Sequence, residues 1–172
     1  FVDFSICTQN ALDYCCQSFT VALNSQQKET LLNEYTLLPS FPDVKVGLQK
    51  LKEAGHSIYA FSNGSKNTIS TLLLHAEIIR LFDGIVSVED VKVFKPSPLV
   101  YEHFNTETNS SPSNSWLISS NPFDVIGSIS YGMRSVWVQR TPDSIFDPWG
   151  IEPSLTIKKI TDLKDQLEKI EK

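Results

Sequence analysis

The first forty residues have helical periodicity and no strand pattern. Residues 6–23 contain no Gly or Pro, and their apolar side chains fall mostly at helical spacing, which predicts a helix. A second helix is predicted over residues 26–37. A proline-rich connector follows, so we expect a boundary in the chain between Pro39 and Pro42.

A third helix is predicted directly after this connector. Asp43 is its predicted N-cap and Gly55 marks its predicted end, because Asp favours the first position of a helix and Gly the position just past the last turn. Its inner face is predicted to carry Val44, Leu48 and Leu51.

Beyond Gly55, short apolar runs alternate with helical segments. Strands are predicted at residues 57–61, 85–88, 116–119 and 135–138. Helices are predicted between them, with inner positions Ile69, Leu72, Leu73 and Ala76 in the first, and over residues 98–106 and 123–132 in the others. This alternation favours the α/β class, with a parallel sheet covered by helices on both faces.

Two further segments complete the predicted organisation. Residues 105–115 are polar and predict a loop without regular structure. Residues 162–172 predict an amphipathic closing helix, with Thr161 as its N-cap and with Leu163, Leu167 and Ile170 facing inward.

Polar clusters follow three of the predicted strands, at the carboxyl ends where parallel sheets bind ligands. They are Ser62-Asn63-Gly64-Ser65, Lys95 in VFKPSPLVY, and the run from Ser119 to Asp124. Each also fits a structural interpretation: a turn with an N-cap at Ser65, an ordinary surface lysine, and helix caps at Asn121 and Asp124. Because all three lie at the predicted ligand edge, we favour the functional interpretation.

Composition narrows the function classes. The chain has 172 residues, 41% of them hydrophobic and 20% charged, which fits one globular domain or a domain with a small appendage. Fifteen Lys and Arg against twenty Asp and Glu give a net charge of −5, so a nucleic-acid surface is not expected and a small molecule is. No apolar run reaches the roughly 18 residues of a membrane span, so we expect no membrane partner. Cys7, Cys15 and Cys16 are an odd number of cysteines in no metal-ligand spacing, and adjacent Cys15 and Cys16 are poor candidates for a disulfide with each other, so a reducing, cytoplasmic compartment is expected.

The three clusters together resemble the haloacid dehalogenase superfamily. The resemblance rests on three motifs: S-N-G-S after a strand, V-F-K-P-x-P-x-x-Y, and I-S-S-N-x-F-D before a G-M-R-S-V-W-V strand. The similarity is greatest to the type II (S)-2-haloacid dehalogenases. It implies a Rossmann-like α/β core over residues 41–172 and the C-terminal part of a helical cap over residues 1–40.

The reaction implied by this resemblance uses no cofactor. An aspartate attacks the halogen-bearing carbon, halide leaves, and water hydrolyses the resulting ester. Phosphatases of the superfamily carry acidic residues in the stretch where this chain has Ser119, Ser120 and Asn121, because Mg²⁺ needs hard carboxylate oxygens. Only Asp124 is acidic here, so metal-free chemistry on a carboxylate substrate is expected.

The resemblance also assigns roles to the catalytic residues. Lys95 resembles the ammonium that keeps the nucleophile ionised, since a nearby positive charge favours a carboxylate over its protonated form. Tyr101 resembles a phenol of the same polar network. Ser119 and Asn121 resemble the hydrogen-bonding groups that fix the lysine and the nucleophile, and Asp124 resembles the carboxylate that orients or activates the hydrolytic water.

The substrate would be held by a second set of residues. Ser62 and the backbone amides near it resemble the group that binds the substrate carboxylate. Asn63 resembles a side-chain donor to the departing halide. Phe4 and Phe123 resemble aromatic residues lining the apolar side of the pocket, although both also fit an ordinary core position.

The nucleophile is absent from this chain. The superfamily's F-D-x-Y-G-T-L string does not occur, and Asp3 in FVDFSI lacks the following G-T. The family's first strand, central in its sheet, is therefore expected to be missing as well. Three functions remain open: a metal-independent hydrolytic dehalogenase of short 2-haloalkanoic acids of which this chain alone is inactive, an inactive fragment or pseudoenzyme that binds small carboxylates, and a phosphatase of the superfamily. The family's dimers through cap helices imply a homodimer.

Overall fold

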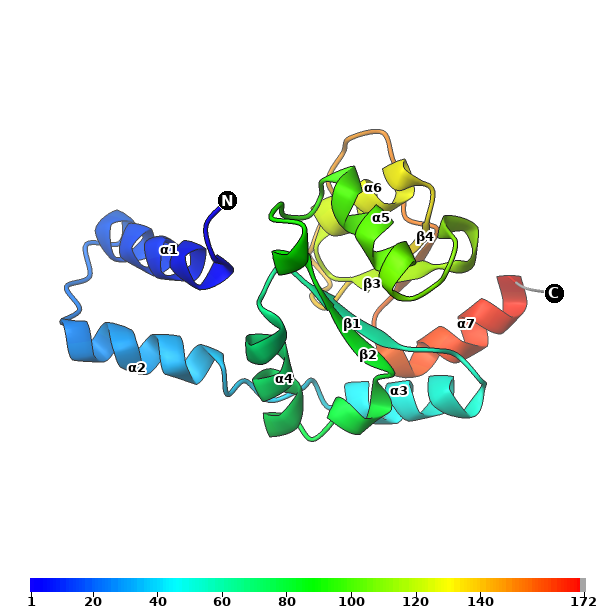
Figure 1. The fold of residues 1–172 in the computed structure, drawn as a ribbon, viewed down its shortest axis with the longest axis horizontal. Helices are drawn as coiled ribbons and strands as arrows, with labels where there is room; N and C mark the ends of the chain where they lie inside the picture. Colours follow the sequence, from blue (N-terminus) through cyan, green and yellow to red (C-terminus); the bar gives the residue numbers. More distant parts are fainter. Residues whose placement is uncertain (171–172) are drawn as a thin grey trace. The chain divides into compact units, whose positions relative to one another are not determined.

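The structure is a computed structural model that describes residues 1–170. The chain forms two compact units, and we describe each by itself (Figure 1). Unit 1 consists of Phe1–Ser40 and Tyr59–Lys92, and unit 2 consists of Phe41–Ile58 and the chain from Val93 onward. The proposed division into a cap over residues 1–40 and a core over residues 41–172 stays a prediction.

Unit 1 contains a pair of helices and a two-stranded parallel sheet. Its elements are α1 (Phe4–Ser18), α2 (Ser25–Tyr35), β1 (Tyr59–Ser62), α4 (Lys66–His75), the 3₁₀ turn η1 (Ile79–Leu81), β2 (Gly84–Ser87) and the 3₁₀ turn η2 (Val88–Asp90). The sheet register places Ser62, the last residue of β1, opposite Ser87, the last residue of β2.

Helix α1 ends five residues earlier than the periodicity predicts. Thr20 has a left-handed backbone with φ of 55°, and the Val21 N–H returns to the Cys16 carbonyl at 2.8 Å. This is a Schellman-type closure of the helix C-terminus, which apolar spacing alone does not reveal. Helix α2 then begins with a capping box between Asn24 and Gln27.

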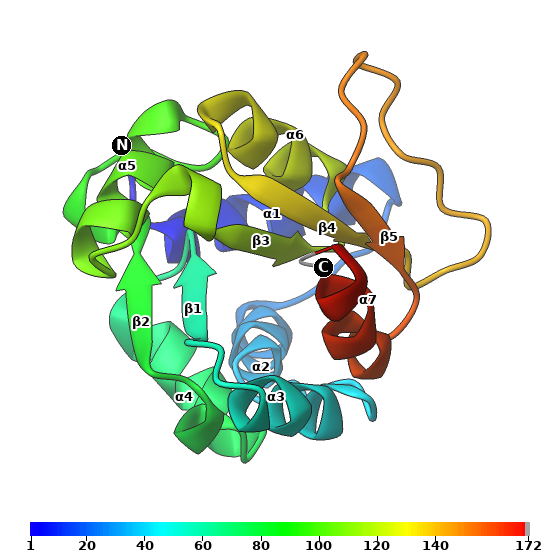
Figure 2. The same ribbon diagram turned by 90° about the vertical axis from the view of Figure 1, so that its right-hand side faces the viewer.

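Unit 2 is built on a three-stranded parallel sheet of order β3-β4-β5 (Figure 2). Its elements are α3 (Val44–Glu53), α5 (Pro98–Glu107), η3 (Pro112–Asn114), β3 (Trp116–Ser119), α6 (Pro122–Tyr131), β4 (Arg134–Val138), β5 (Leu155–Ile157), η4 (Ile160–Asp162) and α7 (Leu163–Ile170). The predicted α/β class with parallel strands is confirmed.

The two faces of β4 serve different neighbours. Val136 and Val138 point into the main core of unit 2, where they pack with Leu51, Ile157 and Leu163. The alternate residue Ser135 is fully buried on the opposite side, where it hydrogen-bonds to Ser128 of α6. Helix α6 is thereby fixed to the sheet, and its first turn lies next to the carboxyl end of β3.

The structure corrects the predicted role of Asp43. It stands at the N-cap position of α3, but its side chain makes no capping bond. Instead its carboxylate accepts two bonds from Arg140, at 2.7 and 2.8 Å, and one from the Ile160 N–H at 2.6 Å. Tertiary partners more than ninety residues away therefore outcompete the local cap. Gly55 ends the helix as predicted, with a left-handed φ of 88°.

Other details of the structure differ from what the sequence predicts. The polar segment 105–115 is organised by hydrogen bonds: Asn105 Nδ2 donates to the half-buried Ser110 Oγ at 2.8 Å and to the buried Ser115 Oγ at 2.9 Å. The short strand β5 has no counterpart among the predicted strands. The last helix begins at Leu163 after a 3₁₀ turn rather than at a Thr161 cap. In that helix Leu163 and Leu167 are buried but Ile170 is exposed, and the predicted residues 171–172 lie outside the described part.

None of the helices within residues 1–170 combines the length and the apolar character needed to cross a lipid bilayer.

Candidate active site

A buried ion pair forms the centre of the candidate site in unit 2. The Lys95 Nζ lies 3.1 Å from Asp124 Oδ2, and the two side chains are only 9% and 5% exposed. Lys95 precedes Pro96 across a cis peptide bond, and Asp124 lies in the first turn of α6. Burying either charge alone would be costly, so each side chain depends on the other. The interpretation of Lys95 as a surface lysine is wrong.

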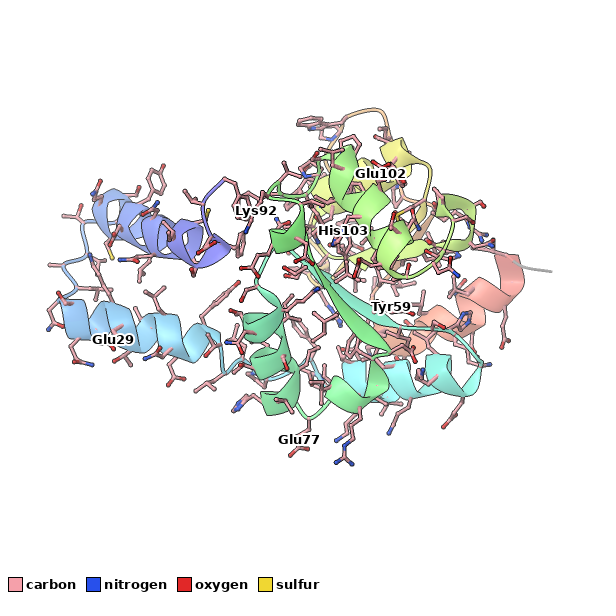
Figure 3. The ribbon with its side chains drawn as sticks, in the orientation of Figure 1. Glu29, Tyr59, Glu77, Lys92, Glu102 and His103 are labelled. Carbon is pink, nitrogen blue, oxygen red and sulfur yellow. The ribbon has the colours of Figure 1, made fainter. Side chains whose placement is uncertain are left out.

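Lys92, three residues earlier in the chain, shows the contrast. It belongs to unit 1, is exposed, and holds its ammonium 5.2 Å from the centre of the Phe1 ring (Figure 3). Proximity in sequence to the K-P motif therefore does not place a lysine in the buried network.

Ser119 joins the ion pair from the last position of β3. Its hydroxyl donates to Asp124 Oδ2 at 3.1 Å and accepts the Asn121 N–H at 3.0 Å. Asp124 Oδ2 thus receives both an ammonium and a hydroxyl. The second carboxylate oxygen, Oδ1, is buried and has no hydrogen-bond partner among residues 1–170. A buried acceptor of this kind costs free energy unless another group satisfies it, and a water molecule fits that need.

Tyr101 ties helix α5 to the same turn. The residue is fully buried, its Oη donates to the Asp124 backbone carbonyl at 3.3 Å, and its ring stacks on Tyr131 with a centroid distance of 5.8 Å. Burial and the negative charge of Asp124 raise the pKa of the Tyr101 phenol well above its ordinary value of 10.0. Tyr101 therefore remains a neutral hydrogen-bond donor at physiological pH.

The other two predicted residues of this loop stand apart from the ion pair. Asn121 is exposed and occupies the N-cap position of α6 without a capping bond from its side chain. Phe123 is 45% exposed, so its interpretation as a core residue is wrong. The structure thus brings Lys95, Tyr101 and Ser119 to Asp124.

The remaining predicted residues, Phe4, Ser62 and Asn63, belong to unit 1. Phe4 is the half-buried first residue of α1. Ser62 and Asn63 are half-buried in the turn after β1, where the Ser62 hydroxyl accepts the Gly64 N–H at 3.1 Å.

Helix α4 begins directly after this turn. Ser65 caps α4 by accepting the Thr68 N–H at 3.2 Å, which confirms the capping interpretation for that residue. The turn therefore joins a strand end to a helix start within three residues.

Ser87 is a structural residue of this turn that the sequence analysis misses. It is fully buried, and its hydroxyl donates to the Gly64 carbonyl at 2.7 Å, which joins the turn after β1 to the end of β2. A signal was available: β1, β2 and β3 each end in Ser, at Ser62, Ser87 and Ser119. Each of these hydroxyls accepts a backbone N–H from the residue two positions later.

Within the described part of the chain, no cluster of three or more His, Cys, Asp or Glu side chains is arranged to hold a metal ion.

The comparisons with known proteins agree on one family. The sequence profile of the haloacid dehalogenase-like hydrolases matches residues 10–138. Haloacetate dehalogenase H-2 of Moraxella sp. (strain B) is 31% identical over 157 residues, which cover 91% of this chain and 70% of the relative. The (S)-2-haloacid dehalogenase H-109 of Pseudomonas putida is 32% identical over 168 residues, which cover 97% and 74%.

The structural comparison points the same way. A solved L-2-haloacid dehalogenase has a TM-score of 0.92 and 25% sequence identity, and the match covers 98% of this chain and 74% of that protein. Profile, relatives and fold concur over most of the chain. It belongs to the haloacid dehalogenase-like hydrolase family.

Proposed function

We propose that the residues of this chain serve a hydrolytic dehalogenase that acts on short 2-haloalkanoic acids through an aspartyl ester and without a metal. The two relatives described above, a haloacetate dehalogenase and an (S)-2-haloacid dehalogenase, support this substrate class. The observation that carries the proposal is the buried pair of Lys95 and Asp124 with Ser119 bound to it.

In the first step a carboxylate oxygen attacks the carbon that bears the halogen. A new C–O bond forms, the carbon–halogen bond breaks, and halide leaves with the bonding electrons. The attacking aspartate is not among the 172 residues in the family's F-D-x-Y-G-T-L context. The proposed role of Lys95 is to stabilise that nucleophile as an anion, since its ammonium is held in a water-poor site where charge interactions are strong.

In the second step water cleaves the ester. Asp124 takes a proton from the water, whose oxygen attacks the ester carbonyl. The ester C–O bond then breaks, the leaving oxygen takes up the proton held by Asp124 to give the 2-hydroxy acid, and the enzyme carboxylate is restored as its own proton passes to solvent. The unpartnered Oδ1 of Asp124 is the atom to which we assign this water, because Oδ2 already accepts bonds from Lys95 and Ser119. Asn121 is assigned to orient the nucleophile from the same loop.

The substrate contacts are assigned to the turn after β1. Ser62 and neighbouring backbone amides would bind the carboxylate, and Asn63 would donate to the departing halide. The turn is braced for such a task, because its Gly64 backbone is held at both ends by Ser62 and Ser87. Phe4 and Phe123 are assigned to the apolar side of the substrate.

The test is halide release by the protein encoded by the complete reading frame that contains this sequence. Chloride released from (S)-2-chloropropionate in the presence of EDTA supports the proposal. A protein that binds the haloacid but releases no halide would be the small-carboxylate-binding pseudoenzyme. Mg²⁺-dependent hydrolysis of a phosphomonoester, without halide release, would instead identify a phosphatase.

A further inference from the structure

We propose that Gly127 is a positioning residue, whose missing side chain leaves the space that keeps Lys95 aligned with Asp124. The inference rests on the proposed function, because it assigns the task of Gly127 within that same site. Gly127 lies in the interior of α6, where glycine is otherwise unfavourable because of its backbone freedom.

Pro96 and Tyr101, from two different segments, approach α6 closely at Gly127. A Cβ atom at Gly127 would lie 2.5 Å from Pro96 Cβ, 2.5 Å from Tyr101 Oη and 3.2 Å from Pro96 Cα. Carbon atoms in van der Waals contact are separated by about 3.5–4.0 Å, so a methyl group cannot be accommodated without movement. Two of these atoms belong to Pro96, the residue covalently joined to Lys95.

Helix α6 itself has little freedom to retreat. On its sheet side the fully buried Ser128 and Ser135 hydroxyls are hydrogen-bonded, and Val125 is also fully buried. A group added at Gly127 would therefore push outward against Pro96 and Tyr101 rather than move the helix into the sheet. Tyr101 is fully buried and cannot yield easily, whereas Pro96 is exposed and can shift outward, and that shift would carry the adjoining Lys95 with it.

Both displaced groups bear on the ion pair. Pro96 is adjacent to Lys95, whose Nζ lies 3.1 Å from Asp124 Oδ2, and Tyr101 Oη donates to the Asp124 backbone carbonyl. Asp124 and Gly127 lie three residues apart in α6, and Pro96 and Tyr101 pack into the space that Gly127 leaves. The glycine thus sets the distance between the two segments that carry the charges.

The test is Gly127→Ala in the complete protein, compared with Gly47→Ala. Gly47 is a matched control, because it is also a helix glycine of unit 2 whose added Cβ would clash, at 2.6 Å from Ile160 Cγ2, and the three nearest atoms all belong to Ile160, which is outside the ion-pair network. Both variants should lower the melting temperature. Only Gly127→Ala should lower kcat for halide release, by about 10²-fold, which is the cost of misplacing catalytic groups by about 1 Å. KM should change less than kcat.

If Gly127→Ala folds poorly, the same substitution made in a Tyr101→Phe variant still tests the inference. Tyr101→Phe removes the Oη that the methyl group would meet, so Gly127→Ala should cost less in that background than in the wild type. An equal cost in both backgrounds, an unchanged kcat in Gly127→Ala, or an equal loss of kcat in Gly47→Ala would overturn the inference.

Crystal structures of the variants separate this inference from the proposed function. We expect a lengthened Lys95 Nζ to Asp124 Oδ2 separation in Gly127→Ala and an unchanged one in Gly47→Ala. If the wild-type protein releases no halide, the proposed function fails, and these two separations still decide the role of Gly127.

Discussion

The turns after β1 and β3 begin with the same local device but carry different chemistry. In both, the last strand residue is a serine whose hydroxyl accepts the backbone N–H two residues later, at 3.1 Å for Ser62 and 3.0 Å for Ser119. The first turn continues into a Ser65-capped helix without an acidic first turn. The second continues into a helix that carries the buried Asp124.

The difference lies in what each serine hydroxyl does next. Ser119 donates to the Asp124 carboxylate, which also binds the Lys95 ammonium, so this turn becomes part of a charged network. The first turn is instead held through its backbone, because the Ser87 hydroxyl donates a hydrogen bond to the Gly64 carbonyl. In our proposal the first turn receives an anion, and the second holds charges that assist a reaction. Substitutions should separate these two tasks.

The largest effect is expected for Asp124→Asn. The amide keeps the shape of the carboxylate but cannot accept a proton, so the ester should form and then persist. We expect kcat to fall by about 10²- to 10⁴-fold, the usual contribution of a general base. Rapid-mixing measurements should still show a burst of about one halide per site, with the covalent adduct detected by intact mass.

Asp90→Asn is the control for this prediction. Asp90 forms an exposed ion pair with Lys66 at 2.9 Å, so its loss should leave kcat within about twofold, since exposed pairs contribute little. A slow first halide release in Asp124→Asn, without a burst, would contradict the division of labour between the two turns.

Lys95→Met should have the next largest effect. Removal of the ammonium leaves the nucleophile without its counter-charge and leaves Asp124 buried without a partner cation. We expect about 10²- to 10³-fold lower kcat/KM, the cost of losing one preorganised electrostatic contact, and about 3–5 kcal/mol lower stability toward urea. Unlike Asp124→Asn, this variant should show no halide burst.

Lys66→Met is the matched lysine substitution, because the Lys66 side chain is 51% exposed in its ion pair. It should retain both activity and stability. If Lys95→Met behaved like Lys66→Met, the buried pair would have no part in the reaction.

A direct comparison of Ser62→Ala with Ser119→Ala sharpens the contrast further. Ser62→Ala loses a hydroxyl that accepts one backbone N–H, so a stability loss of about 1 kcal/mol is expected, whereas Ser119→Ala also loses a bond to the buried Asp124 carboxylate and should lose about 1.5–3 kcal/mol. Their kinetics should differ: Ser62→Ala should raise KM about tenfold, and Ser119→Ala should lower kcat about tenfold. Steady-state halide release measures both constants, and the same constant changing in both variants would argue against separate tasks.

The sequence predicts these turns better than it predicts their connections. Short apolar strands and the Ser65 cap are local features, and the structure has them close to where spacing and composition place them. The resemblance named Lys95, Tyr101, Ser119, Asn121 and Asp124 together, and the structure brings all of them but the exposed Asn121 side chain to one network.

What could not be predicted depends on partners distant in sequence. The sequence predicts Asp43 as a helix cap because it does not reveal the bond from Arg140. It predicts no regular structure for residues 105–115 because it does not reveal that Asn105 and Ser115 are buried and hydrogen-bonded to each other. The space at Gly127 exists only once Pro96 and Tyr101 have packed against α6. Periodicity records which face of an element is buried, but not which atoms it will meet.

The smallest effect on activity is expected for Asp43→Asn, which tests whether any ion pair of unit 2 would mimic Lys95 and Asp124. The Asp43 and Arg140 side chains are 12% and 21% exposed, so this pair is also mostly buried. Losing the charge-assisted bonds to Arg140 and Ile160 should lower the free energy of unfolding at pH 7 by about 1.5–3 kcal/mol. The value of kcat/KM should stay unchanged once it is corrected for the fraction of protein that is folded. A large loss of kcat would show that activity depends on the overall stability of unit 2 and not specifically on the ion pair at the turn after β3.

The same pair predicts a pH dependence with a defined sign. Burial opposes ionisation of Asp43, but the bonds from Ile160 and Arg140 outweigh it and hold its pKa below the ordinary value of 3.8. The stabilisation is therefore complete above the unfolded-state pKa and is lost as pH falls through the lower folded-state value.

Urea unfolding from pH 7 to pH 3 should show the difference in the free energy of unfolding between wild type and Asp43→Asn narrowing only below about pH 4. Asp165→Asn, at a 68% exposed side chain, should follow the wild type throughout. A gap that stayed constant down to pH 3 would mean that Asp43 stabilises unit 2 through packing, and the charge-assisted bonds to Arg140 and Ile160 would then not explain its place at the start of α3.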